Sequence, residues 1–302
     1  MKTIMKNKTK LTNKTKTTTT NNTTKTNNTT TSKTKKNNHI SVFSYNISWE
    51  SMTGKKKNWM LCSVNDNNKD HPKHYSVCVG NISGVIEEND TDFVCLQEAM
   101  DYEKLIKESP RLTKMKHLHH KSGLDNMVTF WKPKYKLLYS IKGEFEEGRP
   151  WLATIFHNGL CLINVHFGHY DDAGEMQMLE LMVQTVKKGI NIEEQKQGNG
   201  NGKGNGKENE KENRNGNKKV NRYIISGDFN YDIKKFGDND SKFILDGVSF
   251  YHNPKKLITC RLNRWRHYDH VIDSKSVPID IVIPDVHHMA SDHKPIIAKL
   301  LN

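Results

Sequence analysis

Asp228 and Asn230 are polar residues placed where they could take part in catalysis. They belong to the segment Ser-Gly-Asp-Phe-Asn-Tyr at residues 226–231, directly after a short apolar run at residues 223–225. An apolar run closed by a glycine predicts a buried β-strand, so both side chains are expected at the mouth of that strand. Carboxylate and amide oxygens in such a place can bind a hard divalent cation or orient a water molecule.

Other apolar runs in the 302-residue chain also border polar residues. They are residues 42–45 before Asn46, residues 93–97 before Glu98, residues 160–165 before His166, and residues 296–301 after Ser291, Asp292 and His293. A single Asp or Asn at a strand end is more often a turn former than a catalyst. Only the set as a whole indicates a functional site.

Six short segments, taken together and in this order, resemble the motifs of the endonuclease/exonuclease/phosphatase superfamily, whose members have a DNase I-like fold. The segments are Tyr45-Asn46-Ile47, Leu96-Gln97-Glu98, Asn164-Val165-His166, Gly227-Asp228-Phe229-Asn230, Tyr268-Asp269-His270-Val271 and Ser291-Asp292-His293. The resemblance runs from about residue 40 to the C-terminus, apart from one insertion. Ser48 departs from it, because the abasic-site endonucleases of the superfamily have an Asp at that position.

The order of the expected elements agrees with the fold that this resemblance implies. Strand-like runs alternate with a few helical ones, including a helix at residues 174–188 that Gly189 is expected to stop. Such a pattern predicts two packed sheets covered by helices. The expected fold is therefore an α/β four-layered sandwich, with two packed mixed β-sheets flanked by helices. The resemblance places the site at one edge, where strand ends converge.

The resemblance implies a hydrolase of phosphoester bonds that depends on Mg²⁺, with Mn²⁺ as the alternative cation. Mg²⁺ prefers oxygen ligands and binds through one or two carboxylates. Glu98 is the expected principal ligand, because a carboxylate after an apolar strand is costly near the core without a cation or a donor. Asn46 would offer an amide oxygen. Asp292 is either a second metal ligand or an acid that anchors the backbone.

The same resemblance implies catalytic roles for five residues. Asp228 would accept a proton from the attacking water or hold that water in line, and Asn230 would orient it or a phosphate oxygen. His166 would donate to the non-bridging oxygens as negative charge builds there. Asp269 and His293 resemble a carboxylate–imidazole pair, in which the carboxylate fixes the tautomer and raises the basicity of the ring.

Two other polar clusters have competing explanations. Arg261, Arg264 and Arg266 form a dense arginine run, and guanidinium groups suit phosphate recognition, so this loop is a candidate substrate-binding element. An ordinary solvated loop explains the arginines equally well. The histidines at 117, 119 and 120 lack paired cysteine or acidic ligands, and a solvated loop is the better interpretation for them.

Composition distinguishes an N-terminal tail and an insertion from the rest of the chain. Residues 1–38 contain ten lysines and no acidic residue, which predicts a disordered Lys/Thr/Asn-rich tail. A Gly/Asn/Lys/Glu-rich segment at about residues 191–221 is expected to be a loop insertion within one domain spanning residues 39–302. The tail carries +10 and residues 191–222 carry +3 of the formal +13, so the remaining core has no net charge.

Charge, hydropathy and cysteine usage limit the cellular context. No run approaches the roughly 18 apolar residues that span a bilayer. The start of the chain lacks the apolar stretch of a secretory signal, and five cysteines are an odd number, so a soluble intracellular protein in a reducing compartment is expected. Cys95 and Cys161 lie in apolar runs and are expected to be buried as small hydrophobic residues.

Three functions remain open from the sequence. The first is a nuclease-type phosphodiesterase acting on nucleic acid, which the basic tail could bind without sequence preference. The second is a phosphatase or phosphodiesterase acting on a small or lipid phosphoester such as an inositol phosphate or sphingomyelin, because a neutral core does not predict a basic groove for a duplex. The third is a binding module that keeps the scaffold without catalysis.

Overall fold

The computed structural model describes most of the folded part of the chain. The described residues are 39–53, 62, 74–123, 125–145, 148–169, 172–199, 219–233, 241–255, 257–260, 266–284 and 290–302. The chain divides into a unit of residues 1–37 and a unit of residues 38–302, and the fold below is that of the second unit. The expected tail and the middle of the expected insertion lie outside the described residues.

Two β-sheets form the centre of this unit. The six-stranded sheet has the order β12 (Asp280–Val282), β13 (Ile296–Leu301), β1 (His39–Asn46), β2 (Phe93–Gln97), β4 (Asp125–Trp131) and β3 (Lys116–Ser122). The seven-stranded sheet has the order β5 (Leu137–Glu144), β6 (Pro150–Phe156), β7 (Leu160–His166), β8 (Arg222–Asp228), β11 (Asp269–Asp273), β10 (Val248–His252) and β9 (Lys242–Leu245). Both are mixed sheets, because β1 pairs with β2 and β7 with β8 in parallel while the other named pairs are antiparallel.

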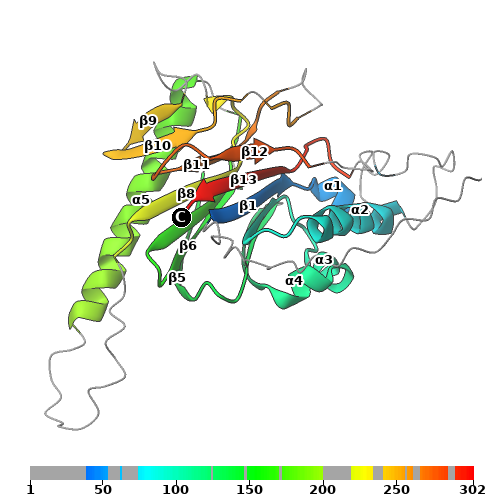
Figure 1. Ribbon diagram of the computed structural model, residues 1–302, viewed down its shortest axis with the longest axis horizontal. Helices are drawn as coiled ribbons and strands as arrows, with labels where there is room; N and C mark the ends of the chain where they lie inside the picture. Colours follow the sequence, from blue (N-terminus) through cyan, green and yellow to red (C-terminus); the bar gives the residue numbers. More distant parts are fainter. Residues whose placement is uncertain are drawn as a thin grey trace, which may run out of the picture. The chain divides into compact units, whose positions relative to one another are not determined.

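Helices cover the outer faces of both sheets. The short helices α1 (Trp49–Thr53), α2 (His74–Glu88), α3 (Glu103–Glu108) and α4 (Pro110–Lys114) lie on the six-stranded sheet, and α5 (Asp172–Asn199) lies on the seven-stranded sheet (Figure 1). Successive residues of a strand point to opposite faces. In β1, Val42 therefore packs between the two sheets, whereas Phe43 packs under the helices. The expected four-layered α/β sandwich is confirmed.

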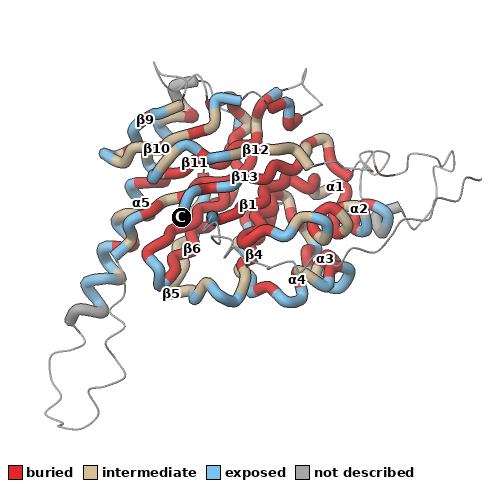
Figure 2. The backbone as a smooth tube through the Cα atoms, viewed as in Figure 1, coloured by how far each residue is buried: buried red, intermediate tan, exposed pale blue. Residues whose placement is uncertain are grey.

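The interface between the sheets is apolar and closed to solvent. Val42, Phe93 and Cys95 of the first sheet meet Leu162 and Ile224 of the second in one buried cluster. Figure 2 shows the central strands as buried, whereas residues 191–196 of α5 are mostly exposed. Each fully buried side chain of this size contributes about 1.5–3 kcal/mol. The strand ends that carry polar groups are thus held in place by a rigid core.

Helix α5 continues further than the sequence predicts. Gly189 was expected to stop it, but the helix runs to Asn199, into the expected low-complexity insertion. A glycine inside a helix costs only about 1 kcal/mol relative to alanine, which neighbouring contacts can outweigh. A Cβ at Gly189 would lie 2.7 Å from Ile141 Cδ1 of β5. Gly189 therefore allows close approach of the helix to the sheet and does not mark its end.

Strand β3 occupies residues for which a solvated loop was expected. His117, His119 and His120 lie in β3 and not in a solvated loop, although His117 and His119 are exposed there. Strand β3 is an edge strand rich in Lys and His. Its sequence therefore does not show the alternation of apolar and polar residues that is typical of a strand.

Gly227 is required by close packing of two parallel strands. It has a φ of 155°, and a Cβ built there would lie 2.0 Å from the carbonyl oxygen of Val165 in β7. We expect Gly227→Ala to lower the free energy of unfolding by more than about 1 kcal/mol, measured by urea denaturation. Gly80→Ala in α2 is the matched control, because nothing lies within 4 Å of its Cβ position. Equal stability of the two variants would contradict this explanation.

The described helices and cysteines bear on the expected cellular context. Among the described residues, no helix is long and apolar enough to cross a membrane. Cys95 and Cys161 are buried and free, as expected. Cys62 and Cys78 form a disulfide with their Cα atoms 5.2 Å apart, which differs from the reduced state expected from the odd cysteine count.

Candidate active site

The carboxyl ends of parallel strands bring the first two polar side chains together. Asn46 is the last residue of β1, and Glu98 directly follows β2, which pairs with β1 in parallel. Asn46 Nδ2 donates to Glu98 Oε1 at 3.2 Å and to Asp228 Oδ2 at 2.9 Å. A single amide therefore links a carboxylate of the first sheet to one of the second.

The second sheet contributes a row of three polar residues by strand register. His166 of β7 lies opposite Asp228 of β8, which lies opposite Asp269 of β11. His166 Nε2 is 3.6 Å from Asp228 Oδ2 and 3.7 Å from Glu98 Oε1. All three residues of the row are at most 1% exposed. The row therefore faces Glu98 in an interior with little water.

His293 completes the cluster from the segment before β13. Its Nδ1 is 2.9 Å from Asp269 Oδ2, and its Nε2 is 3.5 Å from Asp228 Oδ2. Ser291 positions it, since Ser291 Oγ accepts from the His293 backbone N–H and donates to the Asn46 carbonyl. The imidazole is therefore oriented by one carboxylate and directed at another.

Burial and paired carboxylates determine the charges in this cluster. Burial alone would lower the pKa of His293, but the Asp269 and Asp228 carboxylates raise that pKa well above its ordinary value. Burial raises the pKa of Asp228, but His293 and His166 outweigh it and lower that pKa. Near neutral pH, Asp228 is therefore ionised and His293 is in its doubly protonated, positively charged form.

This raised pKa predicts a pH-dependent contribution to stability. A folded-state pKa above the unfolded value means that the stabilisation is complete below about pH 6.5 and is lost as pH rises through the folded pKa. We therefore expect the difference in unfolding free energy between wild type and His293→Gln to shrink on alkalinisation. Chemical denaturation at a series of pH values measures this difference. A difference that widens with rising pH would show that His293 is neutral in the fold.

Asp125 and Arg149 also belong to the site. Asp125 Oδ2 is 2.6 Å from His166 Nδ1, so the second histidine also has a carboxylate partner. Although burial opposes it, the Asp125 carboxylate raises the pKa of His166. Arg149 Nη1 is 2.9 Å from His166 Nε2 and 4.0 Å from Glu98 Oε1.

Unusual backbone conformations occur at the same place. Ser48, Glu98 and Asn230 have φ values of 59°, 54° and 51°. Non-glycine residues rarely adopt this left-handed region, and such strain clusters at functional sites. Asn230 is held by two bonds, from its N–H to Asp228 Oδ1 at 2.8 Å and from its Nδ2 to the Phe167 carbonyl at 2.8 Å.

Asn164, two residues before His166 in β7, forms hydrogen bonds that support the site. It accepts from Gln97 Nε2 at 2.7 Å, and its Nδ2 donates to the carbonyls of Leu96 and Val128. These bonds cross from one sheet to the other at a position where both residues are fully buried. This buried network ties the two sheets together, although Gln97 Oε1 has no hydrogen-bond partner in it.

The remaining expected site residues either lie at the edge of the cluster or fall outside the described residues. The carboxylate of Asp292 is grouped with Cys260 and His293 and accepts from Ser291 Oγ at 3.3 Å. Arg266 is exposed, and its backbone pairs with Cys260, which also bridges to His293. The structure thus places the end of the arginine loop beside the cluster. Arg261 and Arg264 lie outside the described residues.

The donor set suits a hard divalent cation such as Mg²⁺. Oxygens of Glu98 and Asp228 both lie within 3.2 Å of Asn46 Nδ2, so two carboxylates converge at one point. The Glu98 side chain is 17% exposed, which leaves access for water, and Mg²⁺ keeps several waters. Asn46 Oδ1 accepts from the Ser48 N–H at 3.0 Å, so the amide here acts mainly as a donor between the carboxylates. Glu98 is the carboxylate best placed to hold the cation.

Sequence comparison gives one curated relative. No family model matches the chain. Uncharacterized protein L684 of Acanthamoeba polyphaga mimivirus is 29% identical over 278 residues, which cover 86% of this chain and 50% of that protein. The chain therefore spans about half the length of this relative.

Solved structures give the fold. A humanized D. rerio TDP2 matches with a TM-score of 0.55 at 13% identity, covering 87% of this chain and 99% of that one. D. rerio TDP2 complexed with single strand DNA product matches with a TM-score of 0.51 at 13% identity, covering 87% and 98%. An endonuclease/exonuclease/phosphatase family protein from Leptotrichia buccalis matches with a TM-score of 0.51 at 12% identity, covering 86% and 99%. The chain has the DNase I-like fold of these solved structures.

Proposed function

We propose that this protein is a divalent-metal-dependent phosphoesterase, and specifically a nuclease-type phosphodiesterase that uses Mg²⁺. The observation that carries the proposal is the convergence of Asn46, Glu98, Asp228 and His293 from both sheets. Core packing does not require carboxylates and imidazoles to be buried together, because burying charge is costly unless it is paired. Phosphoester hydrolysis can use an ionised carboxylate as a base and a protonated imidazole as a donor to the phosphate.

The residues of the cluster can divide the chemical work. A bound Mg²⁺ at Glu98 would neutralise charge on the phosphoryl oxygens. Asp228, ionised and hydrogen-bonded to the Asn230 N–H, can hold the attacking water and accept its proton. His293 faces Asp228 with a proton available, so it can donate to a phosphate oxygen as negative charge develops. His166 lies beside Asp228, and its Nε2 accepts from the Arg149 guanidinium at 2.9 Å. Asp125 and Asp269 keep the two rings oriented.

Nucleic acid is the substrate class best supported. D. rerio TDP2, which shares the fold, was solved with a single strand DNA product. The ten lysines of residues 1–38 would add sequence-independent attraction to a phosphate backbone. We propose that this segment acts as a basic tail on a domain of residues 39–302. The arginines at 261, 264 and 266 are the proposed contacts to the substrate phosphates.

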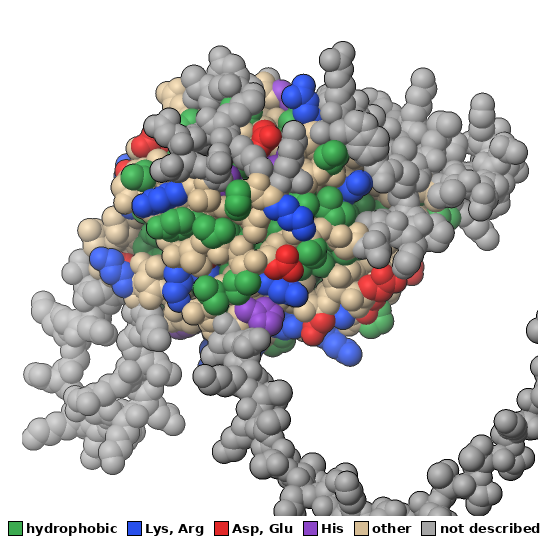
Figure 3. Space-filling model, turned by 45° about the horizontal axis from the view of Figure 1, so that its top comes forward, with side chains coloured by type: hydrophobic (Ala, Val, Ile, Leu, Met, Phe, Trp, Pro, Cys, Tyr) green, Lys and Arg blue, Asp and Glu red, His purple; other side chains and the backbone are tan. Residues whose placement is uncertain are grey.

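One observation favours the second candidate, a phosphatase or phosphodiesterase acting on a small phosphoester. Among the described residues on the face shown in Figure 3, Lys and Arg side chains are scattered between acidic and hydrophobic ones. A dispersed charge pattern suits a small substrate better than a long duplex. The alternative therefore belongs in any substrate test.

A substrate panel distinguishes these functions. Single-stranded DNA, RNA, plasmid and inositol phosphates are each incubated with the protein and Mg²⁺, with EDTA as the control. We expect cleavage of single-stranded nucleic acid that EDTA abolishes. Release of phosphate from inositol phosphates with no strand cleavage would support the second function. Absence of turnover on every phosphoester would contradict both.

Glu98→Gln tests the assignment of the cation. We expect the variant to need more Mg²⁺ for half-maximal activity and to lose at least about 100-fold in kcat, because one hard anionic ligand is removed. A Mg²⁺ titration of cleavage rate measures both effects. Glu108→Gln is the matched control, since Glu108 is an exposed glutamate at the end of α3. An unchanged Mg²⁺ requirement in Glu98→Gln would mean that the cation binds elsewhere.

A further inference from the structure

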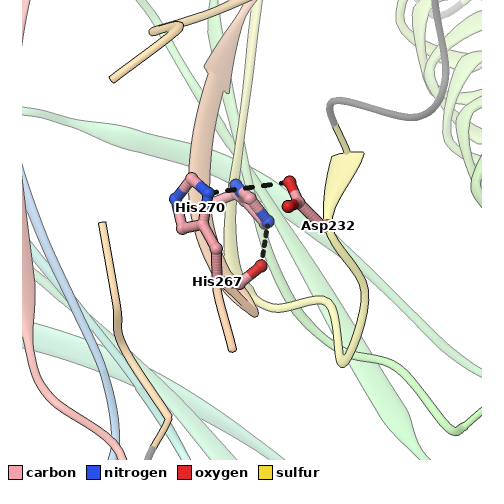
Figure 4. A group of neighbouring side chains, drawn as sticks. All are labelled: Asp232, His267 and His270. Atoms are coloured by element: carbon pink, nitrogen blue, oxygen red, sulfur yellow. Dashed lines mark hydrogen bonds and ion pairs between the residues drawn. The ribbon is translucent and has the colours of Figure 1, made fainter. Parts of the chain in front are cut away.

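A second group of metal-ligand side chains lies near the catalytic residues but on a different face. Asp232 follows β8, His267 precedes β11, and His270 is the second residue of β11 (Figure 4). One ligand atom from each of these three residues lies within 4.8 Å of the other two. Because strand residues alternate in direction, His270 points away from the side on which its neighbour Asp269 meets His293. The group is therefore separate from the proposed catalytic site.

The His267 ring has a buried nitrogen whose hydrogen-bonding capacity is not satisfied. The residue is 6% exposed, and its Nδ1 has no hydrogen-bond partner. Asp232 Oδ1 lies 3.7 Å from this nitrogen, too far for a hydrogen bond. Two ligand atoms on one tetrahedral zinc ion are about 3.3 Å apart, given bonds of about 2.0–2.1 Å. The observed spacing is near that value, and Figure 4 shows the Asp232 carboxylate directed at the two rings.

His270 is held in a form that can bind a metal. Its Nε2 is 2.9 Å from the Tyr231 carbonyl and 3.0 Å from the His267 carbonyl, so Nε2 carries the proton. The free lone pair is then on Nδ1. Metal-binding histidines commonly donate their other N–H to a backbone carbonyl in this way.

We propose that Asp232, His267 and His270 form a binding site for a transition-metal ion of the zinc class, distinct from the proposed Mg²⁺ site. Two imidazoles and one carboxylate suit Zn²⁺, whereas Mg²⁺ prefers all-oxygen ligands. The Asp232 side chain is 29% exposed, so the ion can enter from solvent and keep a water as its fourth ligand. The bound ion ties the segment after β8 to the start of β11.

This position gives the ion a structural role. Strand β8 ends in Asp228, and β11 begins with Asp269, the two carboxylates that face His293. A metal bound to Asp232 and His267 would fix the chain just beyond both of them. The ion is expected to stabilise the arrangement of the catalytic carboxylates without contacting the substrate.

Metal binding to variants of the whole chain tests the site directly. Protein stripped with EDTA and returned to excess Mg²⁺ is titrated with Zn²⁺, and the bound metal is counted by mass spectrometry. We expect wild type to bind one Zn²⁺ per chain at this site, and Asp232→Asn and His267→Gln each to weaken that binding at least about 100-fold. A rise in melting temperature with Zn²⁺ is expected in wild type and not in these variants.

Matched variants separate this site from other histidines and from the catalytic cluster. His117→Gln/His119→Gln removes the exposed pair on β3, and Asp228→Asn alters the neighbouring group of Asp228, Asp269 and His293. Both variants are expected to bind one Zn²⁺ per chain, as wild type does. Its retention in His267→Gln, its loss in Asp228→Asn, or the absence of Zn²⁺ binding by wild type would each overturn the proposal.

A ligand-exchange variant keeps the test decisive if a deletion of a ligand unfolds the chain. His267→Cys preserves a metal ligand at the position. With Co²⁺ in place of Zn²⁺, a thiolate–cobalt charge-transfer band above the wild-type spectrum is expected only if residue 267 binds the ion. A folded His267→Cys protein without this band would also overturn the proposal.

Discussion

Asp228→Asn is expected to lower kcat by about 10²–10⁴-fold, the range for loss of a general base. The replacement keeps the shape of the side chain but removes the negative charge that His166 and His293 stabilise. The amide can neither accept a proton from water nor attract the two imidazoles. Because Asn46 already donates to this oxygen at 2.9 Å, the variant can keep its hydrogen bond and its fold.

Single-turnover and steady-state rates on the substrate that the panel identifies measure this loss. Asp101→Asn is the control, because Asp101 is exposed and its ion pair with Lys104 is worth little. Circular dichroism and melting temperature confirm that both variants are folded. A kcat of Asp228→Asn within threefold of wild type would mean that Asp228 is not the base.

The largest effect on stability is expected at a buried ion pair away from the site. Arg222 of β8 donates to both carboxylate oxygens of Asp273 in β11, at 3.0 and 2.7 Å. The side chains are 6% and 0% exposed. Asp273→Asn leaves the guanidinium buried without its counter-charge, which costs about 3–5 kcal/mol. Strands β8 and β11 carry Asp228 and Asp269. We therefore also expect Asp273→Asn to lose activity on heating at a lower temperature than wild type does.

Denaturant unfolding of three proteins tests the buried pair. Asp273→Asn is compared with wild type and with the double variant Arg222→Met/Asp273→Leu. The double variant removes both charges and is expected to recover most of the lost stability, because hydrophobic replacement of a buried pair is often neutral. If Asp273→Asn lost less than about 1 kcal/mol, the pair would be weaker than its bidentate geometry indicates.

The fold could be predicted because its signals are local and repeat. Short apolar runs mark strands that are buried on both faces, as in β4, β6 and β7. The polar residues that end β1, β7 and β8 lie at the carboxyl ends of parallel pairs, and such ends meet at one edge. The sequence could therefore name Asn46, Glu98, His166 and Asp228 as neighbours before their pairing was known.

Other features depend on contacts that no local pattern contains. Asp125 reaches His166 only through the antiparallel pairing of β2 with β4 and the stacking of the two sheets. Gly189 has the composition of a helix stop, but its packing against Ile141 decides otherwise. The metal-ligand group of Asp232, His267 and His270 joins segments 35 residues apart and matches no spacing motif. Tertiary packing overrides or creates each of these features.

The Glu98 carboxylate is expected to hold a divalent cation between the two sheets, on the side that faces Asp228. Anomalous diffraction from crystals soaked in Mn²⁺, with a phosphate or sulfate ion present, would locate it directly. We expect an anomalous peak within bonding distance of a Glu98 oxygen, on the side facing Asp228 and His166. A peak only at other sites, in a protein whose phosphoesterase activity persists in EDTA, would contradict it.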